Sequence, residues 1–195
     1  MVTSRGCNLL GGNRLLMQQS RHFRCLGIIL RGVGILLAIL IMAPAVFASN
    51  LAAPTGPVLL TVTGEFARTN HENSARFDAA MLAALPQHRI ETSTPWTDGK
   101  NVFEGVLLSD LFEFLGVKDA QTLRTVALNE YAITSPFSEA IEHGALLAMR
   151  MDGKALTRRD KGPIWIVYPR DGNPRIQDER HDARWVWQLT RIEVQ

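Results

Sequence analysis

An uncharged run from Gly32 to Phe47 divides this sequence into two parts. Only the residues after this run are expected to form a folded domain. Three arginines closely precede the run, and Ala48 ends a small-x-small motif directly after it. A basic region, an apolar stretch and small residues in this order are typical of a secretory signal peptide. We therefore expect residues 1–48 to be a signal peptide cleaved after Ala48, and the mature protein to be periplasmic or secreted.

The alternative to cleavage is a retained membrane anchor. The uncharged run of 16 residues is shorter than the roughly 20 that a membrane-spanning helix needs. Cys25 lies before the apolar run, so a lipoprotein anchor is not expected. The polar lead is long for a signal peptide, and Met17 would start a more ordinary one. We expect no stable membrane span after cleavage.

Charge and cysteine content narrow the function classes of the remaining chain. All 19 acidic residues but only 16 of the 21 basic ones follow Ala48, so residues 49–195 carry a formal charge of −3. This mildly acidic balance argues against a nucleic-acid partner, which requires a basic face. Both cysteines, Cys7 and Cys25, lie in the N-terminal segment. A single domain over residues 49–195, stabilised by an apolar core rather than by disulfides, is expected.

The residue pattern after Ala48 alternates short strands with few helices. Runs rich in β-branched residues predict strands, and the Asp152-Gly153 pair predicts a two-residue hairpin turn. Two helices are predicted, one from Ala75 to Leu85 and one that Ser109 caps and Gly116 ends. The predicted strands, about eight in all, span residues 58–63, 89–94, 102–106, 123–128, 145–151, 154–156, 163–168 and 185–194. This pattern predicts an α+β domain with a mixed sheet.

One strand and one helix face are predicted to form the centre of the core. The spacing of the apolar residues from Phe103 to Leu115 places them on one side of a strand and a helix. We expect Phe103, Leu107, Leu111, Phe112 and Leu115 to be buried together.

Common catalytic motifs are absent from the sequence. It contains no G-x-S-x-G, no H-E-x-x-H and no glycine-rich phosphate loop. The histidines after Ala48 are His71, His88, His143 and His181, and none is at ligand spacing from another. We expect them to be surface or capping residues, with no metal site.

Two local features are more informative. Pro95 to Gly99 reads P-W-T-D-G directly after a predicted strand, and Gly162 to Asp171 reads G-P-I-W-I-V-Y-P-R-D. A strand that ends in arginine and aspartate beside a tryptophan is typical of a pocket rim. The alternative, that Trp96 and Trp165 simply pack in the core, has equal weight.

Taken in order, several segments resemble the oxidoreductase molybdopterin-binding domain, the central fold of the sulfite oxidase family. The most specific segment is the F-x-G-V-x-L-x-D-L block that begins at Phe103. The others are L-T-V-T-G from Leu60, A-L-N-E-Y from Ala127, L-L-A-M-R-M-D-G-K-A-L from Leu146, G-P-I-W-I-V-Y-P from Gly162 and W-Q-L-T-R-I-E-V from Trp187. The resemblance implies an α+β fold of the sulfite oxidase molybdopterin-binding type and makes molybdopterin the candidate cofactor.

The positions at which this sequence departs from the family pattern are those that hold the cofactor in the family. The family holds molybdenum through a cysteine, and the resemblance places Thr94 or Ser93 at that position. A hydroxyl group is a poor substitute for a soft thiolate ligand. By the same resemblance, Trp165 and Val186 occupy positions where the family tends to have basic residues. Arg170 and Arg184 lie nearby in the sequence and are candidates to replace their charge.

Two interpretations of function therefore stay open. One is an exported redox enzyme, or a remnant of one, that still holds a pterin. The other is a cofactor-free module that binds a small polar or anionic ligand, or a membrane-associated partner such as a sensor. Fold alone does not decide between them, and the missing cysteine favours the second. By resemblance, the ligand pocket lies where three loops converge, at Ser93, Thr94, Trp96, Asp98, Asn129, Tyr131, Arg170 and Asp171.

Overall fold

A computed structural model describes residues 51–195, in which the strands form two sheets. The predicted signal peptide and its cleavage after Ala48 lie outside the described residues. No helix within the described part is long and apolar enough to cross a membrane.

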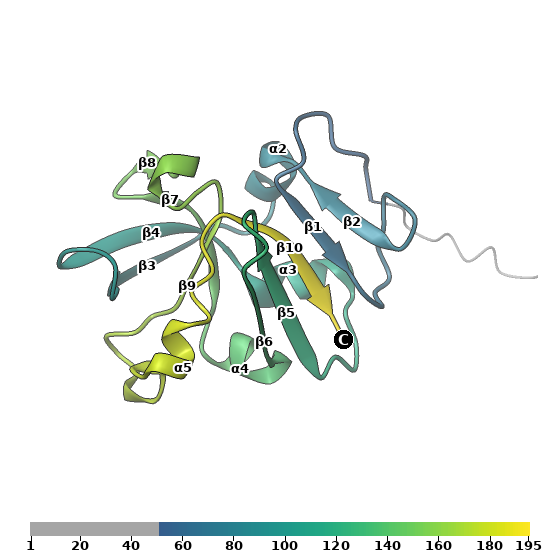
Figure 1. Cartoon of the computed structure of the whole chain (residues 1–195). Helices are drawn as coiled ribbons and strands as arrows, with labels where there is room; N and C mark the ends of the chain where they lie inside the picture. The colour runs from purple at the N-terminus through teal and green to yellow at the C-terminus, as the bar shows by residue number, and fades with distance from the viewer. Residues whose placement is uncertain (1–50) are drawn as a thin grey trace, which may run out of the picture. The chain divides into compact units, whose positions relative to one another are not determined.

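The first sheet has the strand order β2-β1-β10-β5-β6 (Figure 1). Strands β1 and β10 pair in parallel, and the other neighbours are antiparallel. The sheet thus joins the beginning and the end of the domain through one parallel pair. Its strands are β1 (Leu60–Thr63), β2 (Ser74–Phe77), β5 (Thr122–Ala127), β6 (Ala132–Pro136) and β10 (Leu189–Val194).

The second sheet has the order β3-β4-β7-β8, with β9 paired to β7. All of its pairs are antiparallel. The predicted hairpin turn between β7 and β8 is confirmed, because Asp152 and Gly153 have φ angles of 49° and 74°. The strands are β3 (His88–Ser93), β4 (Lys100–Leu107), β7 (Leu146–Met151), β8 (Lys154–Ala155) and β9 (Trp165–Val167).

Four short α-helices connect the described strands. They are α2 (Ala79–Ala83), α3 (Leu108–Leu115), α4 (Phe137–Glu142) and α5 (Glu179–Asp182), and two 3₁₀ turns, η1 (Arg158–Asp160) and η2 (Pro174–Ile176), complete the connections. Helix α3 ends as predicted at Gly116, which adopts the left-handed conformation with φ 73°.

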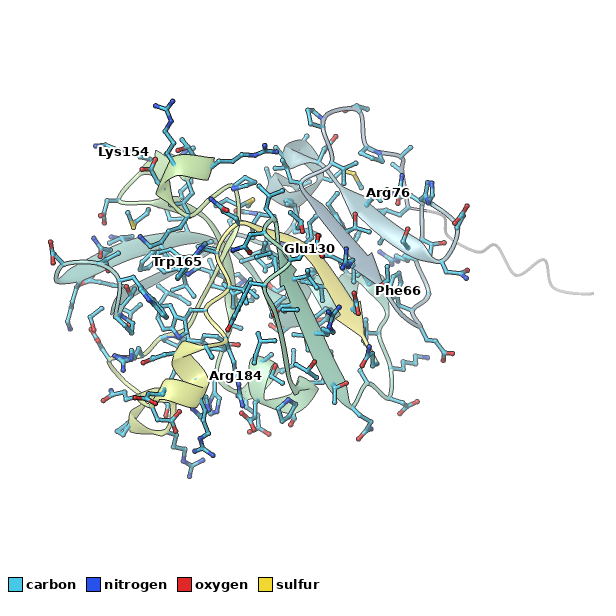
Figure 2. All side chains as sticks on the ribbon, viewed as in Figure 1. Phe66, Arg76, Glu130, Lys154, Trp165 and Arg184 are labelled. Atoms are coloured by element: carbon cyan, nitrogen blue, oxygen red, sulfur yellow. The ribbon has the colours of Figure 1, made fainter. Side chains whose placement is uncertain are left out.

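Both sheets and α3 contribute to one apolar core. Phe103, Leu111, Phe112 and Leu115 are buried together as predicted, whereas Leu107 is only partly buried. Figure 2 shows Trp165 in the interior among the side chains of the second sheet. The α+β class is confirmed, with more strands than the pattern predicted.

Two local predictions are wrong. Residues 75–77 belong to β2 rather than to a helix, because Asp78 caps α2 by accepting a hydrogen bond from the Met81 backbone N–H at 2.9 Å. Ser109 does not cap α3, because the helix already begins at Leu108, directly after β4. The Leu108 N–H donates to the Ala145 carbonyl at 2.9 Å, so it needs no side-chain cap.

Candidate functional site

All four tryptophans of the chain gather in one cluster. Trp96 is in the turn after β3, Trp165 is on β9, and Trp185 and Trp187 lie between α5 and β10. The ring of Trp96 is central, with its centroid 5.5 Å from that of Trp187 and 5.7 Å from that of Trp185. Trp165 and Trp185 are buried, whereas Trp187 is 37% exposed. The cluster therefore runs from the core to the surface.

A cavity of about 240 Å³ opens beside the outer part of this cluster. Its walls come from three separate parts of the chain: the turn after β3, the β5–β6 turn, and the last residue of α5 with the segment that follows it. Tyr131, which is 46% exposed, lies in this lining and donates a hydrogen bond from its hydroxyl to the Ala183 carbonyl at 2.9 Å. The lining residues are Trp96, Ala127, Asn129, Tyr131, Asp182, Ala183, Trp185, Val186 and Trp187.

Few polar groups face this mostly aromatic cavity. The side-chain Oδ1 atom of Asn129 accepts a hydrogen bond from the Tyr131 backbone N–H at 3.1 Å. Asp182 is the one charged residue in the lining. Its Oδ1 atom lies 3.5 Å from Nη2 of Arg170, and Arg170 is not part of the lining. The lining thus includes one acidic residue and no basic one.

The structure brings together three of the predicted site residues and separates the others from them. Trp96, Asn129 and Tyr131 line the same cavity, but Arg170 is outside the lining and pairs with Asp182. Asp98 is exposed in the loop before β4. Whether this cavity binds a ligand remains a prediction.

A second group of predicted residues forms at the end of β3. The Asp171 carboxylate accepts hydrogen bonds from the Ser93 hydroxyl and backbone N–H, and lies 3.3 Å from Nζ of Lys100. The Ser93 hydroxyl, with help from Lys100, holds the pKa of Asp171 below its usual value. Ser93 and Asp171 thus bind each other at the end of β3, and neither residue lines the cavity.

Thr94 serves the turn that carries Trp96. Its buried hydroxyl accepts a hydrogen bond from the Trp96 backbone N–H at 3.0 Å and shares another with the Thr97 hydroxyl at 2.8 Å. These bonds orient the turn so that the Trp96 ring reaches the aromatic cluster.

Sequence reasoning missed Asp182, Trp185 and Trp187. The W-V-W spacing placed both tryptophans two residues apart, which puts them on one side of an extended segment. That spacing could have indicated an aromatic wall. No local signal marks Asp182, because its place in the lining depends on how the segment around α5 folds relative to the strands.

Comparison with known proteins identifies the fold. The family model of the oxidoreductase molybdopterin binding domain matches residues 63–172. The chain belongs to this family. A search of curated proteins found no match.

A solved structure agrees with this assignment. The sulfane dehydrogenase SoxCD from Paracoccus pantotrophus superposes with a TM-score of 0.51 at 19% sequence identity. The match covers 69% of this chain and 37% of that chain, so this chain spans little more than a third of the length of its structural relative. At this identity the likeness shows the fold alone, and it confirms the predicted sulfite oxidase-like class.

The residues of this family member do not fit a molybdenum-bearing pterin. The described residues contain no cysteine. The hydroxyls of Ser93 and Thr94, which stand nearest the expected ligand position, are both engaged in hydrogen bonds with Asp171 and the Trp96 turn. A pterin phosphate needs cationic donors, but the only charged residue lining the cavity is Asp182. No thiolate is therefore present among the described residues at the position where the resemblance places the molybdenum ligand of the family.

Proposed function

We propose that this protein is an exported, cofactor-free member of the molybdopterin-binding-domain family that binds a small organic cation in its aromatic cavity. The observation that supports this most directly is the lining itself: four aromatic side chains, Trp96, Tyr131, Trp185 and Trp187, with one carboxylate from Asp182. Aromatic faces attract cations through the ring quadrupole, and this attraction is strongest when several rings surround the ligand.

The same lining argues against the anionic ligand that the sequence predicts. That expectation rested on a cationic Arg170 in the pocket, but Arg170 is outside the lining and pairs with Asp182. The lining offers an anion aromatic side chains and one acidic residue, and no cationic side chain.

Export supplies the setting of this proposal. A binding module released from its signal peptide would sample solutes outside the cytoplasm. The partner that reads the bound state would then be a membrane-associated protein, such as a sensor.

Titration with choline tests the ligand class, because the tryptophan fluorescence of the cavity reports occupancy. We expect choline to quench this fluorescence saturably, and its neutral isostere 3,3-dimethylbutan-1-ol to bind at least tenfold more weakly. Asp182→Asn and Trp187→Ala should each weaken choline binding about tenfold, which corresponds to the cost of one cation–π or charge contact. Phe66→Ala, at a partly buried residue outside the cavity lining, is the matched control and should bind like the wild type. Equal affinity for the cation and its isostere would contradict the proposal.

The second candidate function is a redox enzyme that retains the pterin, and the family assignment is what favours it. We expect protein purified from its native periplasm to contain less than one molybdenum atom per ten chains by elemental analysis, because no thiolate is present to ligate the metal. Stoichiometric molybdenum together with turnover of sulfite or a sulfoxide would establish the enzyme and exclude the cofactor-free module.

A further inference from the structure

A second cluster of chemically active side chains lies outside the cavity, where α4 meets α5. Figure 1 shows these two helices at the same end of the molecule. Glu139 is on α4, His143 caps the C-terminal end of α4, and His181 is on α5. One nitrogen or carboxylate oxygen atom from each of the three lies within 4.8 Å of the others. The rings of His143 and His181, which are not at ligand spacing in the sequence, thus come together in the fold, with centroids 5.8 Å apart.

The orientation of His181 directs its two ring nitrogens to different carboxylates. Its Nδ1 atom lies 2.7 Å from Oδ1 of Asp178, a carboxylate oxygen that can only accept, so Nδ1 donates this hydrogen bond. The other ring nitrogen, Nε2, lies 3.5 Å from Oε2 of Glu139. Both of these atoms are of the kinds that ligate zinc in proteins.

The spacing of Nε2 of His181 and Oε2 of Glu139 suits a metal ion. Two ligands of a tetrahedral zinc ion, each roughly 2.0–2.2 Å from the metal, lie about 3.4 Å apart. The observed separation of 3.5 Å between Nε2 of His181 and Oε2 of Glu139 is close to this value. Asp178 then acts as the outer carboxylate that fixes the ring of a metal-binding histidine.

Two neighbours oppose metal binding and limit its strength. Arg184, labelled beside α5 in Figure 2, contacts the same Glu139 oxygen. Its hydrogen bond holds the pKa of Glu139 below the usual value, so this carboxylate is ionised but partly neutralised. Nδ2 of Asn173 lies 3.2 Å from Nδ1 of His143, and the Asn173 oxygen accepts from the Arg175 N–H. Metal binding through Nε2 of His143 would therefore move the ring proton to Nδ1 and break that hydrogen bond.

We propose that Glu139, His143 and His181 form a site for a divalent transition-metal ion, with zinc as the best-fitting metal. Two imidazoles and one carboxylate are a ligand set that zinc accepts, with a fourth position left for water. The site is separate from the aromatic cavity, but α5 contributes to both, because Asp182 follows His181 directly. Bound metal would hold α5 against α4 and thereby fix one wall of the cavity.

Calorimetric titration with zinc chloride tests the proposal. The full chain is used with Cys7→Ser and Cys25→Ser, which remove competing thiols, after treatment with a chelator. We expect one equivalent of zinc to bind, and His143→Ala and His181→Ala each to weaken binding at least tenfold. His88→Ala is the matched control, because His88 also contacts a carboxylate, Asp110 at 2.6 Å, outside the cluster. The proposal would be overturned if the protein with both histidines bound zinc no more tightly than the His143→Ala/His181→Ala double variant.

A gain-of-affinity variant keeps the test decisive if an alanine variant unfolds. The aspartate in Asn173→Asp would still accept a hydrogen bond from the Arg175 N–H. It would also accept one from the Nδ1–H group of His143 once Nε2 binds the metal. We expect this variant to bind zinc at least threefold more tightly, as outer-shell carboxylates do. An unchanged or lower zinc affinity in Asn173→Asp would contradict coordination by His143 and overturn the three-residue site.

Discussion

Replacing Trp165 by alanine is expected to lower the free energy of unfolding by about 3–5 kcal/mol. Its side chain is fully buried on β9 and contacts Phe103 edge-to-face, with ring centroids 5.3 Å apart. It also supports Trp96 and Trp185, which carry the aromatic cavity. The loss combines the transfer energy of the indole with the cavity left behind, since neighbouring strands relax only partly. Urea denaturation followed by circular dichroism measures it.

Two other substitutions distinguish the loss of core packing at Trp165 from the general effect of removing a tryptophan. Trp187→Ala makes the same change at the partly exposed edge of the cluster and should cost about 1 kcal/mol. Trp165→Phe keeps an aromatic ring, and it removes an indole N–H that has no hydrogen-bond partner among the described residues. It should therefore cost less than half of the alanine loss. If Trp165→Ala and Trp187→Ala cost the same, Trp165 is not a core residue.

The fold was predictable where local signals agreed with tertiary packing. Helix α3 combines apolar residues at helical spacing with a glycine at its end, and both signals act within one element. Strand β2 was missed for the opposite reason. Phe77 is the last inward residue of a strand and Met81 lies on the following helix, yet their separation of four residues imitates a single helix. Only the cap at Asp78 marks the boundary between them.

The candidate site was predictable in part for a similar reason. Trp96 and Tyr131 follow strands of different sheets, and loops at strand ends are a common place for binding residues. Arg170 is outside the cavity lining because it pairs with Asp182, which is twelve residues away in the sequence. The two residues meet only through the fold of the segment around η2 and α5. His143 and His181 likewise come together only because α4 and α5 pack at one end of the domain. Contacts of this kind leave no trace in residue spacing.

Replacing Gly105 by alanine is expected to destabilise the second sheet by about 3 kcal/mol, because the added methyl group has no space. A Cβ atom at this position would lie 1.9 Å from the Leu147 carbonyl oxygen and 2.8 Å from its carbon. Both are backbone atoms of β7, the neighbouring strand, so no side-chain rotation relieves the clash. Gly105 also lies at the irregularity where the register of β4 and β7 shifts. The strands would have to separate at their centre, and thermal and urea denaturation should both show the loss.

Gly172→Ala is the matched control for this prediction. Nothing lies within 4 Å of a Cβ atom built at Gly172, and its backbone is outside the left-handed region that favours glycine. The same chemical change there should alter the free energy of unfolding by no more than about 0.5 kcal/mol. Because both variants reduce the entropy of the unfolded chain equally, the difference between them isolates the clash with β7. A difference below about 1 kcal/mol would show that β4 and β7 do not approach as closely at Gly105 as their register requires.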